Sequence, residues 1–303
     1  MRAPLALAAC LLAPLTACAG TPAPPPVVGT PPSPPAVRYM IGGDSRDDAA
    51  HVLPWAFREA RARGATAFFF LGDMELTPQL DEHFRSALPL LGPVAFYPAL
   101  GNHEVKWFGF ASIGHDAAES AFKSRFLDTP LTPIHTSIPN KVVYGVTLAG
   151  GVHFVALDNV SQAGFGKDQL AWLDADLARA RQDPAVKHII VGMHKPLAKN
   201  GVTNHAMDAD GAGAVADSDA AIATMAKYGV SLIVASHVHA FAAFKTSGIP
   251  TYISGGLGAP LDRGGPDYSF HHFLQVDVNG DDLRVSVVRF DGKPSVGDGE
   301  DKD

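Results

Sequence analysis

Five short polar stretches constrain the fold of this chain most strongly, because four of them stand where a run of apolar residues ends. In chain order they are Gly43-Asp44-Ser45-Arg46, Gly72-Asp73, Gly101-Asn102-His103-Glu104, His194 and Ser236-His237-Val238-His239. Enzymes with alternating strands and helices collect functional side chains at the ends of their strands. Asp, Asn and His are also ligands that hard or borderline divalent cations prefer. The pattern therefore predicts strand ends that together form a metal site.

The composition fits a globular protein and narrows the ligand chemistry. The chain has 303 residues, enough for one large domain or two small ones, and 47% of its residues are hydrophobic. Its net charge of −7 argues against a protein that coats nucleic acid. Both cysteines, Cys10 and Cys18, lie near the start of the chain, so we expect no disulfide and no thiolate metal ligand in the folded part. Any metal ion must bind to oxygen and imidazole nitrogen.

Residues 1–17 are typical of a bacterial lipoprotein signal peptide. A positive Arg2 precedes the apolar stretch from Leu5 to Leu15, which is too short to remain as a membrane span. Leu15-Thr16-Ala17-Cys18 resembles a lipobox, which implies cleavage before Cys18 and acylation of that residue. Several acyl chains would hold the protein on a membrane, whereas one chain would not. An ordinary secretory signal, which would give a secreted protein, is the alternative.

The residues after the cysteine indicate where such a lipoprotein would lie. Ala19 occupies the position at which an inner-membrane retention signal has Asp, which favours the periplasmic face of the outer membrane. Residues 18–36 are dense in Pro and predict an extended tether. We expect the folded domain at residues 37–292 and a disordered tail at residues 293–303.

Strands and helices alternate along the folded part. Short apolar runs predict strands at residues 37–41, 66–71, 94–100, 142–148, 152–157, 186–193, 230–235, 249–254, 270–278 and 283–290. Helices are predicted at residues 47–63, 79–90, 168–181 and 217–228. This alternation predicts an α/β fold with largely parallel strands. Residues 105–140 lack a clear period and are expected to form an insertion over the site, and residues 198–215 are expected to form a loop.

Taken together and in this order, the five stretches resemble the motifs of the calcineurin-like metallophosphoesterases, most closely those of the branch that contains the purple acid phosphatases. The resemblance runs from about Val37 to Phe290 and includes less polar stretches such as Val152 to Asn159 and Tyr252 to Gly256. It implies a four-layer α/β/β/α sandwich with two mixed β-sheets and the metal ions at one edge. The implied activity is metal-dependent hydrolysis of phosphate esters by a metal-bound hydroxide. The implied substrate is a phosphorylated small molecule, with phosphomonoesters favoured.

The resemblance also implies a ligand set for two divalent or trivalent ions of Fe, Mn or Zn, about 3.5–4 Å apart. Asp73 would bridge the two ions with its carboxylate. Three further residues would complete the coordination of one ion: Asn102, His194 and His237. Asn102 would bind through its amide oxygen. The other ion would be bound by Asp44 and His239.

Two positions depart from the family pattern, and both lie where the ion held by Asp44 and His239 would have a further ligand. Where the family usually has His, two residues after Asp44, the chain has Arg46, whose guanidinium has no lone pair to donate. Where the purple acid phosphatases have a Tyr ligand, three residues after the bridging Asp, the chain has Leu76. Three protein ligands suffice for a catalytic site, but binding should be weaker, and tight binding of a single ion stays open. An iron-loaded sample should lack the visible absorption of a tyrosinate–iron bond.

Two residues are candidates for direct action on the substrate. In the family, the residue at the position of His103 lies beside the leaving-group oxygen and protonates it, a task that suits an imidazole. The alternative for His103 is a hydrogen bond to a carboxylate such as Asp73. Arg46 could bind two phosphate oxygens and stabilise charge in the transition state. The alternative for Arg46 is an ion pair that orients its loop, with one of the acidic residues Asp47, Asp48 and Glu75.

Other functions also fit these residues. One is a phosphodiesterase of the same fold, and another is a catalytically impaired metal- and phosphate-binding lipoprotein, because Arg46 replaces the usual His. Lys195 and Lys199 follow a metal ligand, where they could attract an anionic substrate or simply be solvated. His205, in the loop after His194, is a weaker candidate for substrate contact.

Overall fold

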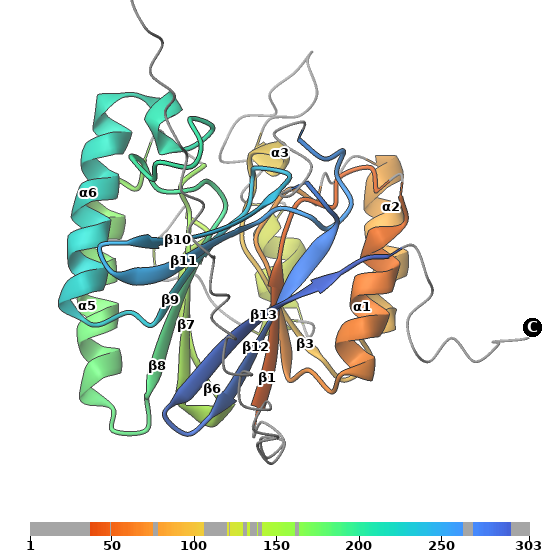
Figure 1. Ribbon diagram of the computed structural model, residues 1–303, viewed down its shortest axis with the longest axis horizontal. Coiled ribbons are helices and arrows are strands. Elements are labelled where there is room, and N and C mark those ends of the chain that lie inside the picture. The colour runs from red at the N-terminus through yellow and green to blue at the C-terminus, as the bar shows by residue number, and fades with distance from the viewer. Residues whose placement is uncertain are drawn as a thin grey trace, which may run out of the picture. The chain divides into compact units, whose positions relative to one another are not determined.

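Two β-sheets pack against each other in the computed structural model of this chain (Figure 1). The structure describes residues 37–48, 50–74, 78–105, 120, 122–129, 132–133, 138, 141–160, 164–262 and 269–291. They belong to a unit that spans Pro35 to Asp303. The predicted signal peptide, tether and tail lie outside the described residues.

The first sheet has five strands in the order β13-β12-β1-β2-β3. Their bounds are β1 Val37–Gly42, β2 Ala67–Phe70, β3 Ala95–Pro98, β12 His272–Asn279 and β13 Asp282–Arg289. β1, β2 and β3 run parallel, while β12 pairs antiparallel with both β1 and β13. The loops that follow the three parallel strands therefore leave from the same edge of the sheet.

The second sheet has six strands in the order β10-β11-β9-β8-β7-β6. Their bounds are β6 Tyr144–Leu148, β7 Val152–Leu157, β8 His188–Met193, β9 Leu232–Ala235, β10 Phe241–Thr246 and β11 Ile249–Ser254. β7, β8, β9 and β11 are parallel, and the edge strands β6 and β10 are antiparallel to their neighbours. All residues of β7, β8 and β9 are buried, which explains why these strands read as continuous apolar runs.

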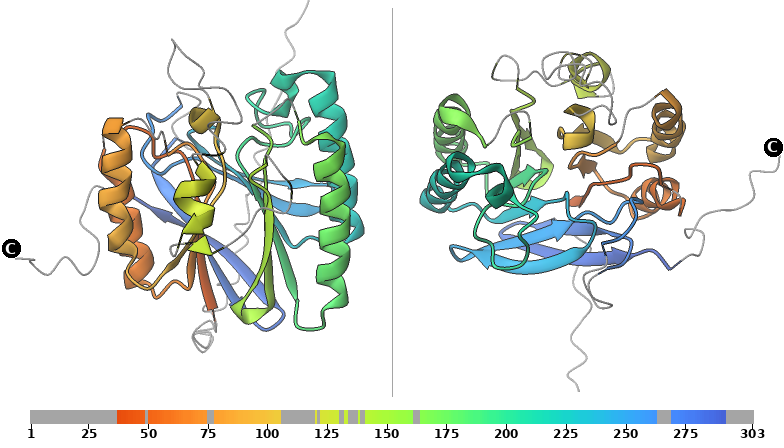
Figure 2. Two further views of the ribbon diagram at one scale, coloured as in Figure 1. Left: turned by 180° about the vertical axis from the view of Figure 1, so that it is seen from behind. Right: turned by 90° about the horizontal axis from the view of Figure 1, so that it is seen from above.

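Helices cover the outer face of each sheet (Figure 2). They are α1 Val52–Ala62 and α2 Pro78–Ala87 on the first sheet, and α5 Gly166–Gln182 and α6 Ala212–Lys227 on the second. Phe57 of α1 packs edge-on against Phe68 of β2, with ring centroids 5.3 Å apart. Between the sheets, Phe69 stacks on Phe154 at 3.8 Å. The predicted four-layer α/β/β/α sandwich with two mixed sheets is confirmed.

Shorter elements connect these layers. They are helix α3 Asn102–Val105, a π-helical turn at Lys123–Leu127, 3-10 segments at Leu88–Leu91, Ala149–Gly151 and Met207–Asp210, and the strand pair β4 Asp128–Thr129 and β5 Thr132–Pro133. Among the described residues, none of the helices combines the length and the apolar character that a membrane crossing requires.

Three elements differ from the sequence-based expectation. Helix α1 begins at Val52 rather than at residue 47, because Arg46, Asp48 and His51 have positive φ angles of 43°, 44° and 55° that a right-handed helix does not allow. The Asp48 carboxylate instead accepts hydrogen bonds from the backbone N–H groups of Val52 and Leu53. Helix α6 begins at Ala212 rather than at residue 217, and β10 is not predicted.

Candidate metal centre

The predicted metal ligands follow the carboxyl ends of strands. Asp44 and Asp73 come after β1 and β2, and Asn102 opens α3 shortly after β3. His194 directly follows β8, and His237 follows β9. The strands involved are parallel within each sheet, so each sheet presents its ligands at one edge.

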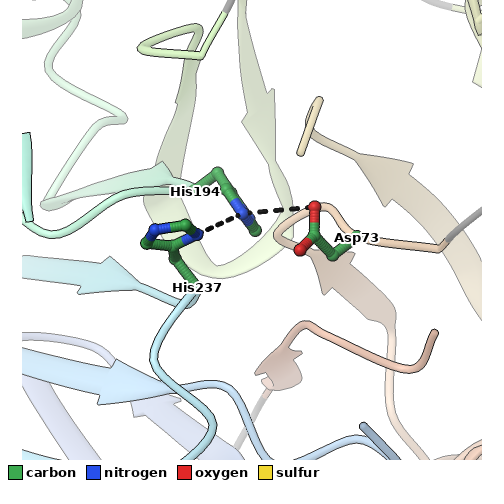
Figure 3. Close-up of side chains that lie close together, drawn as sticks. All are labelled: Asp73, His194 and His237. Carbon is green, nitrogen blue, oxygen red and sulfur yellow. Dashed lines mark hydrogen bonds and ion pairs between the residues drawn. The ribbon is translucent and has the colours of Figure 1, made fainter. Parts of the chain in front are cut away.

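One group of side chains joins the two sheets (Figure 3). Asp73, His194 and His237 each offer a ligand atom, and these atoms lie within 4.8 Å of one another. Nε2 of His194 is 3.3 Å from Oδ1 of Asp73 and 3.1 Å from Nδ1 of His237. The same nitrogen lies 2.9 Å from Oδ1 of Asn102. These are the four residues expected around one ion.

A second group lies beside the first and shares Asp73 with it. Asp44, Asp73 and His239 offer ligand atoms that also lie within 4.8 Å of one another. Nδ1 of His239 donates a hydrogen bond to the carbonyl of Pro260 at 2.7 Å, while its Nε2 lies 3.5 Å from Oδ1 of Asp44. A carboxylate common to two adjacent groups has the position needed to bridge two ions. Binding of ions by these groups stays a prediction.

The chemistry of the two groups fits metal ions. Oδ1 of Asp44 is buried and receives no hydrogen bond from any described residue, which is costly for a carboxylate oxygen that no cation compensates. The donors are carboxylate and amide oxygens and imidazole nitrogens, which suit Fe, Mn or Zn. Asp44, Asp73 and His237 have left-handed φ angles of 64°, 59° and 68°. Such conformations cost about 1 kcal/mol or more each and are concentrated at functional sites.

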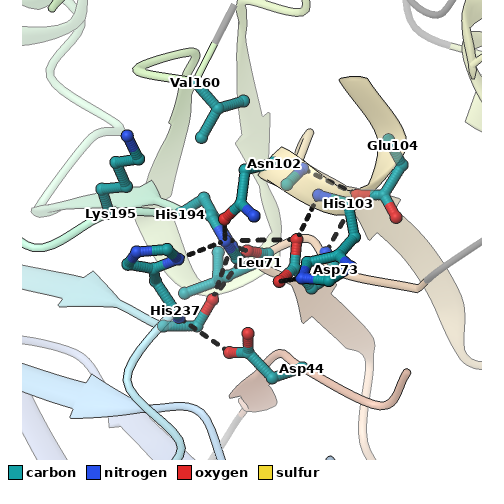
Figure 4. A network of polar contacts seen from close by, with 12 residues as sticks. Asp44, Leu71, Asp73, Asn102, His103, Glu104, Val160, His194, Lys195 and His237 are labelled. Carbon is teal, nitrogen blue, oxygen red and sulfur yellow. Dashed lines mark hydrogen bonds and ion pairs between the residues drawn. The ribbon is translucent and has the colours of Figure 1, made fainter. Parts of the chain in front are cut away.

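His194 is oriented by Leu71, which follows β2 of the other sheet (Figure 4). Its Nδ1 donates a hydrogen bond to the carbonyl of Leu71 at 2.8 Å, and Ser236 Oγ donates to the same carbonyl at 2.7 Å. Nε2 therefore faces Asp73. Burial lowers the pKa of His194, but the charge of Asp73 outweighs burial and raises this pKa to about 9. An ion that binds Nε2 must displace a proton.

The other two imidazoles have opposite electrostatic environments. Burial, together with the nearby His194 and His205, lowers the pKa of His237 to about 2. His237 is therefore neutral and keeps a lone pair for a metal ion. Burial also disfavours the charged form of His239, but the Asp44 carboxylate, whose Oδ1 lies 3.5 Å from Nε2 of His239, outweighs burial and raises the pKa of His239.

The loop after β3 holds Asp73 in place. Oε2 of Glu104 accepts hydrogen bonds from the backbone N–H groups of Asp73 and Gly101, at 2.9 and 2.8 Å. Burial, and then the charge of Asp73, raise the pKa of Glu104 to about 7. Burial alone would raise the pKa of Asp73, but the positive charges of His194 and His103 lower it below the ordinary value. Asp73 is thus a buried anion that needs cationic neighbours.

His103, a predicted catalytic residue, lies against Asp73. Its backbone N–H donates to Oδ1 of Asp73 at 2.9 Å, and its Nε2 lies 3.8 Å from Oδ2. The ring is partly exposed. This position agrees with both roles considered for His103, the donation of a proton to a substrate and an interaction with the carboxylate.

Arg46, the other predicted catalytic residue, is also adjacent to Asp73 through its backbone. Its N–H donates to the carbonyl of Asp73 at 3.1 Å, and the residue is half-buried. Asp48 is one of the acidic residues that could pair with Arg46. Its carboxylate accepts hydrogen bonds from the backbone N–H groups at the start of helix α1. Glu75 lies outside the described residues, as does Leu76.

The two lysines after His194 have carboxylate partners. Nζ of Lys195 lies 2.6 and 2.7 Å from the two carboxylate oxygens of Asp210. Nζ of Lys199 lies 2.6 Å from Oδ2 of Asp219. These carboxylates offset the charges that would attract an anionic substrate.

The structure makes His205 a stronger candidate for substrate contact than the sequence does. Its ring centroid lies 4.2 Å from that of His237, so an exposed imidazole stands directly beside a candidate metal ligand. The sequence indicates a link to the site only because His205 lies in the loop that follows His194. The spacing does not reveal that this loop returns to the site.

A family model described as calcineurin-like phosphoesterase matches residues 41–241, which include all the predicted ligands. Purple acid phosphatase 22 of Arabidopsis thaliana is 28% identical over 182 residues, which cover 59% of this chain and 39% of that protein. The chain therefore spans less than half the length of this curated relative.

Two solved structures share the fold. A purple acid phosphatase from yellow lupin (Lupinus luteus) seeds has a TM-score of 0.63 at 15% identity, over 85% of this chain and 52% of that chain. A dimetal phosphatase from Danio rerio has a TM-score of 0.61 at 15% identity, over 84% of this chain and 96% of that chain. The similarity to purple acid phosphatases supports the branch that the motifs predict. On the strength of the family match, the chain belongs to the calcineurin-like phosphoesterase family.

Proposed function

We propose that the protein hydrolyses phosphate esters with two bound metal ions and that phosphomonoesters are its preferred substrates. The observation that carries this proposal is the position of Asp73, whose carboxylate belongs to both groups of ligand atoms. One ion would be held with it by Asn102, His194 and His237, and the other by Asp44 and His239. Bound ions would supply Lewis acidity toward the phosphate oxygens and lower the pKa of water.

The chain's own residues would position the ester and supply one proton. The His103 side chain is partly exposed, and its Nε2 lies 3.8 Å from Oδ2 of Asp73, which would stabilise the imidazolium before it protonates the leaving-group oxygen. Arg46 would donate hydrogen bonds to phosphate oxygens, since its backbone contact with Asp73 keeps the residue beside the site.

The preference for monoesters is supported by His205. A monoester carries one more unsubstituted phosphate oxygen than a diester, and that oxygen needs a further hydrogen-bond donor. The His205 ring lies 4.2 Å from the His237 ring and is exposed, so it is available as that donor. The proposed substrate is therefore a small phosphorylated molecule whose phosphate enters between His103 and His205.

The proposed location is the periplasmic face of the outer membrane, with lipid on Cys18 as the anchor. The lipobox-like sequence and the Pro-rich tether support this location. A secreted protein would result if Cys18 is not acylated. Mass spectrometry of the mature N-terminus tests the anchor, because an unmodified N-terminus beyond the signal peptide contradicts it.

The test of the function combines metal content with turnover. The purified protein without its tether is loaded with Mn²⁺, Zn²⁺ or Fe, and its metal stoichiometry is measured. Hydrolysis of p-nitrophenyl phosphate is then compared with that of bis(p-nitrophenyl) phosphate. The proposal expects up to two ions per chain and faster turnover of the monoester. Faster turnover of the bis-ester would indicate a phosphodiesterase, and tight metal binding without turnover would indicate the impaired binding lipoprotein.

A further inference from the structure

The segment from Lys195 to Asp210 begins beside one candidate ligand and returns to another. Lys195 follows His194 in the sequence, and the His205 ring lies tilted beside the His237 ring, with the centroids 4.2 Å apart. Within the described residues, the His205 ring forms no hydrogen bond, and only its backbone N–H is held, by Thr203 Oγ1 at 3.0 Å. The place of this exposed ring therefore depends on the backbone of its loop.

An ion pair joins the two ends of this loop. Nζ of Lys195 contacts both carboxylate oxygens of Asp210, at 2.6 and 2.7 Å. The two side chains are only 15% and 19% exposed, whereas those of the Lys199–Asp219 pair are 59% and 52% exposed. A partly buried pair with two contacts is less screened by water than an exposed one, so it restrains the backbone more strongly.

Both ends of the ion pair rest on rigid structure. At one end, the buried Asn159 beyond β7 receives a hydrogen bond from the backbone N–H of Lys195 at 3.1 Å and donates one to its carbonyl at 2.8 Å. At the other end, Asp210 closes the 3-10 segment that starts at the buried Met207. Met207 donates its backbone N–H to the carbonyl of Pro196 at 3.0 Å.

We infer that Lys195 and Asp210 form a clasp whose task is to position His205 beside His237, rather than to bind the substrate directly. The inference rests on the proposed function, because it assigns the His205 ring to the substrate phosphate. Lys195 and Asp210 are positioning residues: they act through the loop, and the phosphate is contacted by His205. Without the clasp, the loop keeps its other contacts, but the ring no longer has a fixed place at the site.

The primary test replaces Asp210 with Asn and His205 with Ala in the metal-loaded protein. Each single variant should raise KM for p-nitrophenyl phosphate about tenfold, the loss expected for one hydrogen bond to a charged group, with kcat within about twofold of wild type. The dissociation constant for inorganic phosphate, measured by calorimetry, should rise by the same factor. Metal stoichiometry should stay at the wild-type value.

A double variant separates positioning from general stability. If Asp210 acts only through His205, then the variant with both changes should be no worse than His205→Ala alone. Additive losses would overturn the inference. Lys195→Arg can still contact both oxygens of Asp210, so it should keep near-wild-type KM and phosphate affinity. Loss of phosphate affinity in Lys195→Arg as severe as in Asp210→Asn would also overturn it.

The Lys199–Asp219 pair provides the matched control. Lys199 lies on the same loop and contacts Asp219 of α6 at 2.6 Å, but this pair is exposed. Asp219→Asn should leave KM and phosphate affinity unchanged, and an effect equal to that of Asp210→Asn would contradict a specific clasp. Failure of the proposed function can be distinguished from failure of the clasp, because the wild-type protein would then hydrolyse neither ester. Phosphate calorimetry would still report on the clasp in that case.

Discussion

Nε2 of His194 lies 3.3 Å from Oδ1 of Asp73, although the two residues come from different sheets. Both side chains are buried, and Nδ1 of His194 is engaged by the carbonyl of Leu71. Without a metal ion, this pair is an ion pair in which His194 carries the proton, because its pKa is raised to about 9. A metal ion and this proton therefore compete for one nitrogen.

Metal binding should consequently release a proton and strengthen as pH rises. Since His194 is protonated in the metal-free protein below about pH 9, affinity should rise up to about tenfold per pH unit between pH 6.5 and 8.5. Calorimetric titration with Zn²⁺ in two buffers of different ionisation enthalpy measures the released protons directly. An affinity that is flat over this range, with no dependence of the enthalpy on the buffer, would contradict the prediction.

Gly101 should tolerate no side chain, because the loop after β3 passes too close to Asp73. A Cβ at Gly101 would lie 2.1 Å from the backbone N and 2.3 Å from Oδ1 of Asp73. Gly101→Ala must displace the carboxylate, so we expect loss of bound metal and a fall of about 3 kcal/mol in the free energy of unfolding. Gly213 in α6 is the control, since a Cβ there meets nothing within 4 Å. Gly213→Ala should keep its metal and change stability by about 1 kcal/mol or less; equal behaviour of the two variants would refute the argument.

The sequence predicted the individual strands and the ligand clusters for the same reason, whereas the stacking of two sheets was expected only from the resemblance to the family. Strands such as β7, β8 and β9 are buried on both faces, so they appear as unbroken apolar runs, and the polar residues that end them stand out. β10 escaped detection because Phe241–Thr246 is at most partly buried and is separated from His239 only by Ala240, without a turn residue. α6 was predicted to begin late because Gly211 and Gly213 look like loop residues.

The conformation of the loops was beyond prediction. Residues 44–51 contain several left-handed residues, and their φ angles depend on contacts with distant chain segments rather than on local sequence. One such contact is the hydrogen bond from the backbone of Arg46 to the carbonyl of Asp73. Likewise, no periodicity in the sequence predicts that His205 approaches His237 or that Lys195 pairs with Asp210.

Arg46→His should restore the ligand that the family usually has at this position. An imidazole offers a lone pair where guanidinium has none. The left-handed φ of 43° at Arg46 is also accepted by His more readily than by most residues. We expect affinity for the more weakly bound ion to rise at least about tenfold, the scale on which site residues alter metal binding. Metal content after dialysis against a weak chelator measures this, and a stoichiometry equal to that of wild type would count against it.

Arg46→Gln is the control for that substitution and also tests the phosphate contact. Gln removes the charge without adding an imidazole, so metal content should stay at the wild-type level. At matched metal content, kcat/KM for p-nitrophenyl phosphate should fall about 10–100-fold if the guanidinium binds phosphate oxygens. Unchanged turnover would show that Arg46 only orients its loop.

His272 should make the fold sensitive to acid independently of the metal centre. Its ring is fully buried at the start of β12, its Nδ1 donates to the carbonyl of Phe270 at 2.8 Å, and its Nε2 has no hydrogen-bond partner among the described residues. Burial, with further contributions from His271 and Arg289, lowers the pKa of His272 to about 4. Because the ordinary value is about 6.5, the unfolded chain binds a proton between these values and the folded protein does not.

The stability that this neutral ring contributes is therefore present above about pH 6.5 and is lost as pH falls through about 4, a total of about 3 kcal/mol. His272→Asn keeps a donor for the Phe270 carbonyl but cannot titrate. Urea unfolding with a chelator present, from pH 7 to 4.5, excludes metal release as a cause. Over this range the free energy of unfolding should fall more steeply for wild type than for His272→Asn, by up to about 1.4 kcal/mol per pH unit. Parallel pH profiles for the two proteins would mean that folding does not lower the pKa of His272.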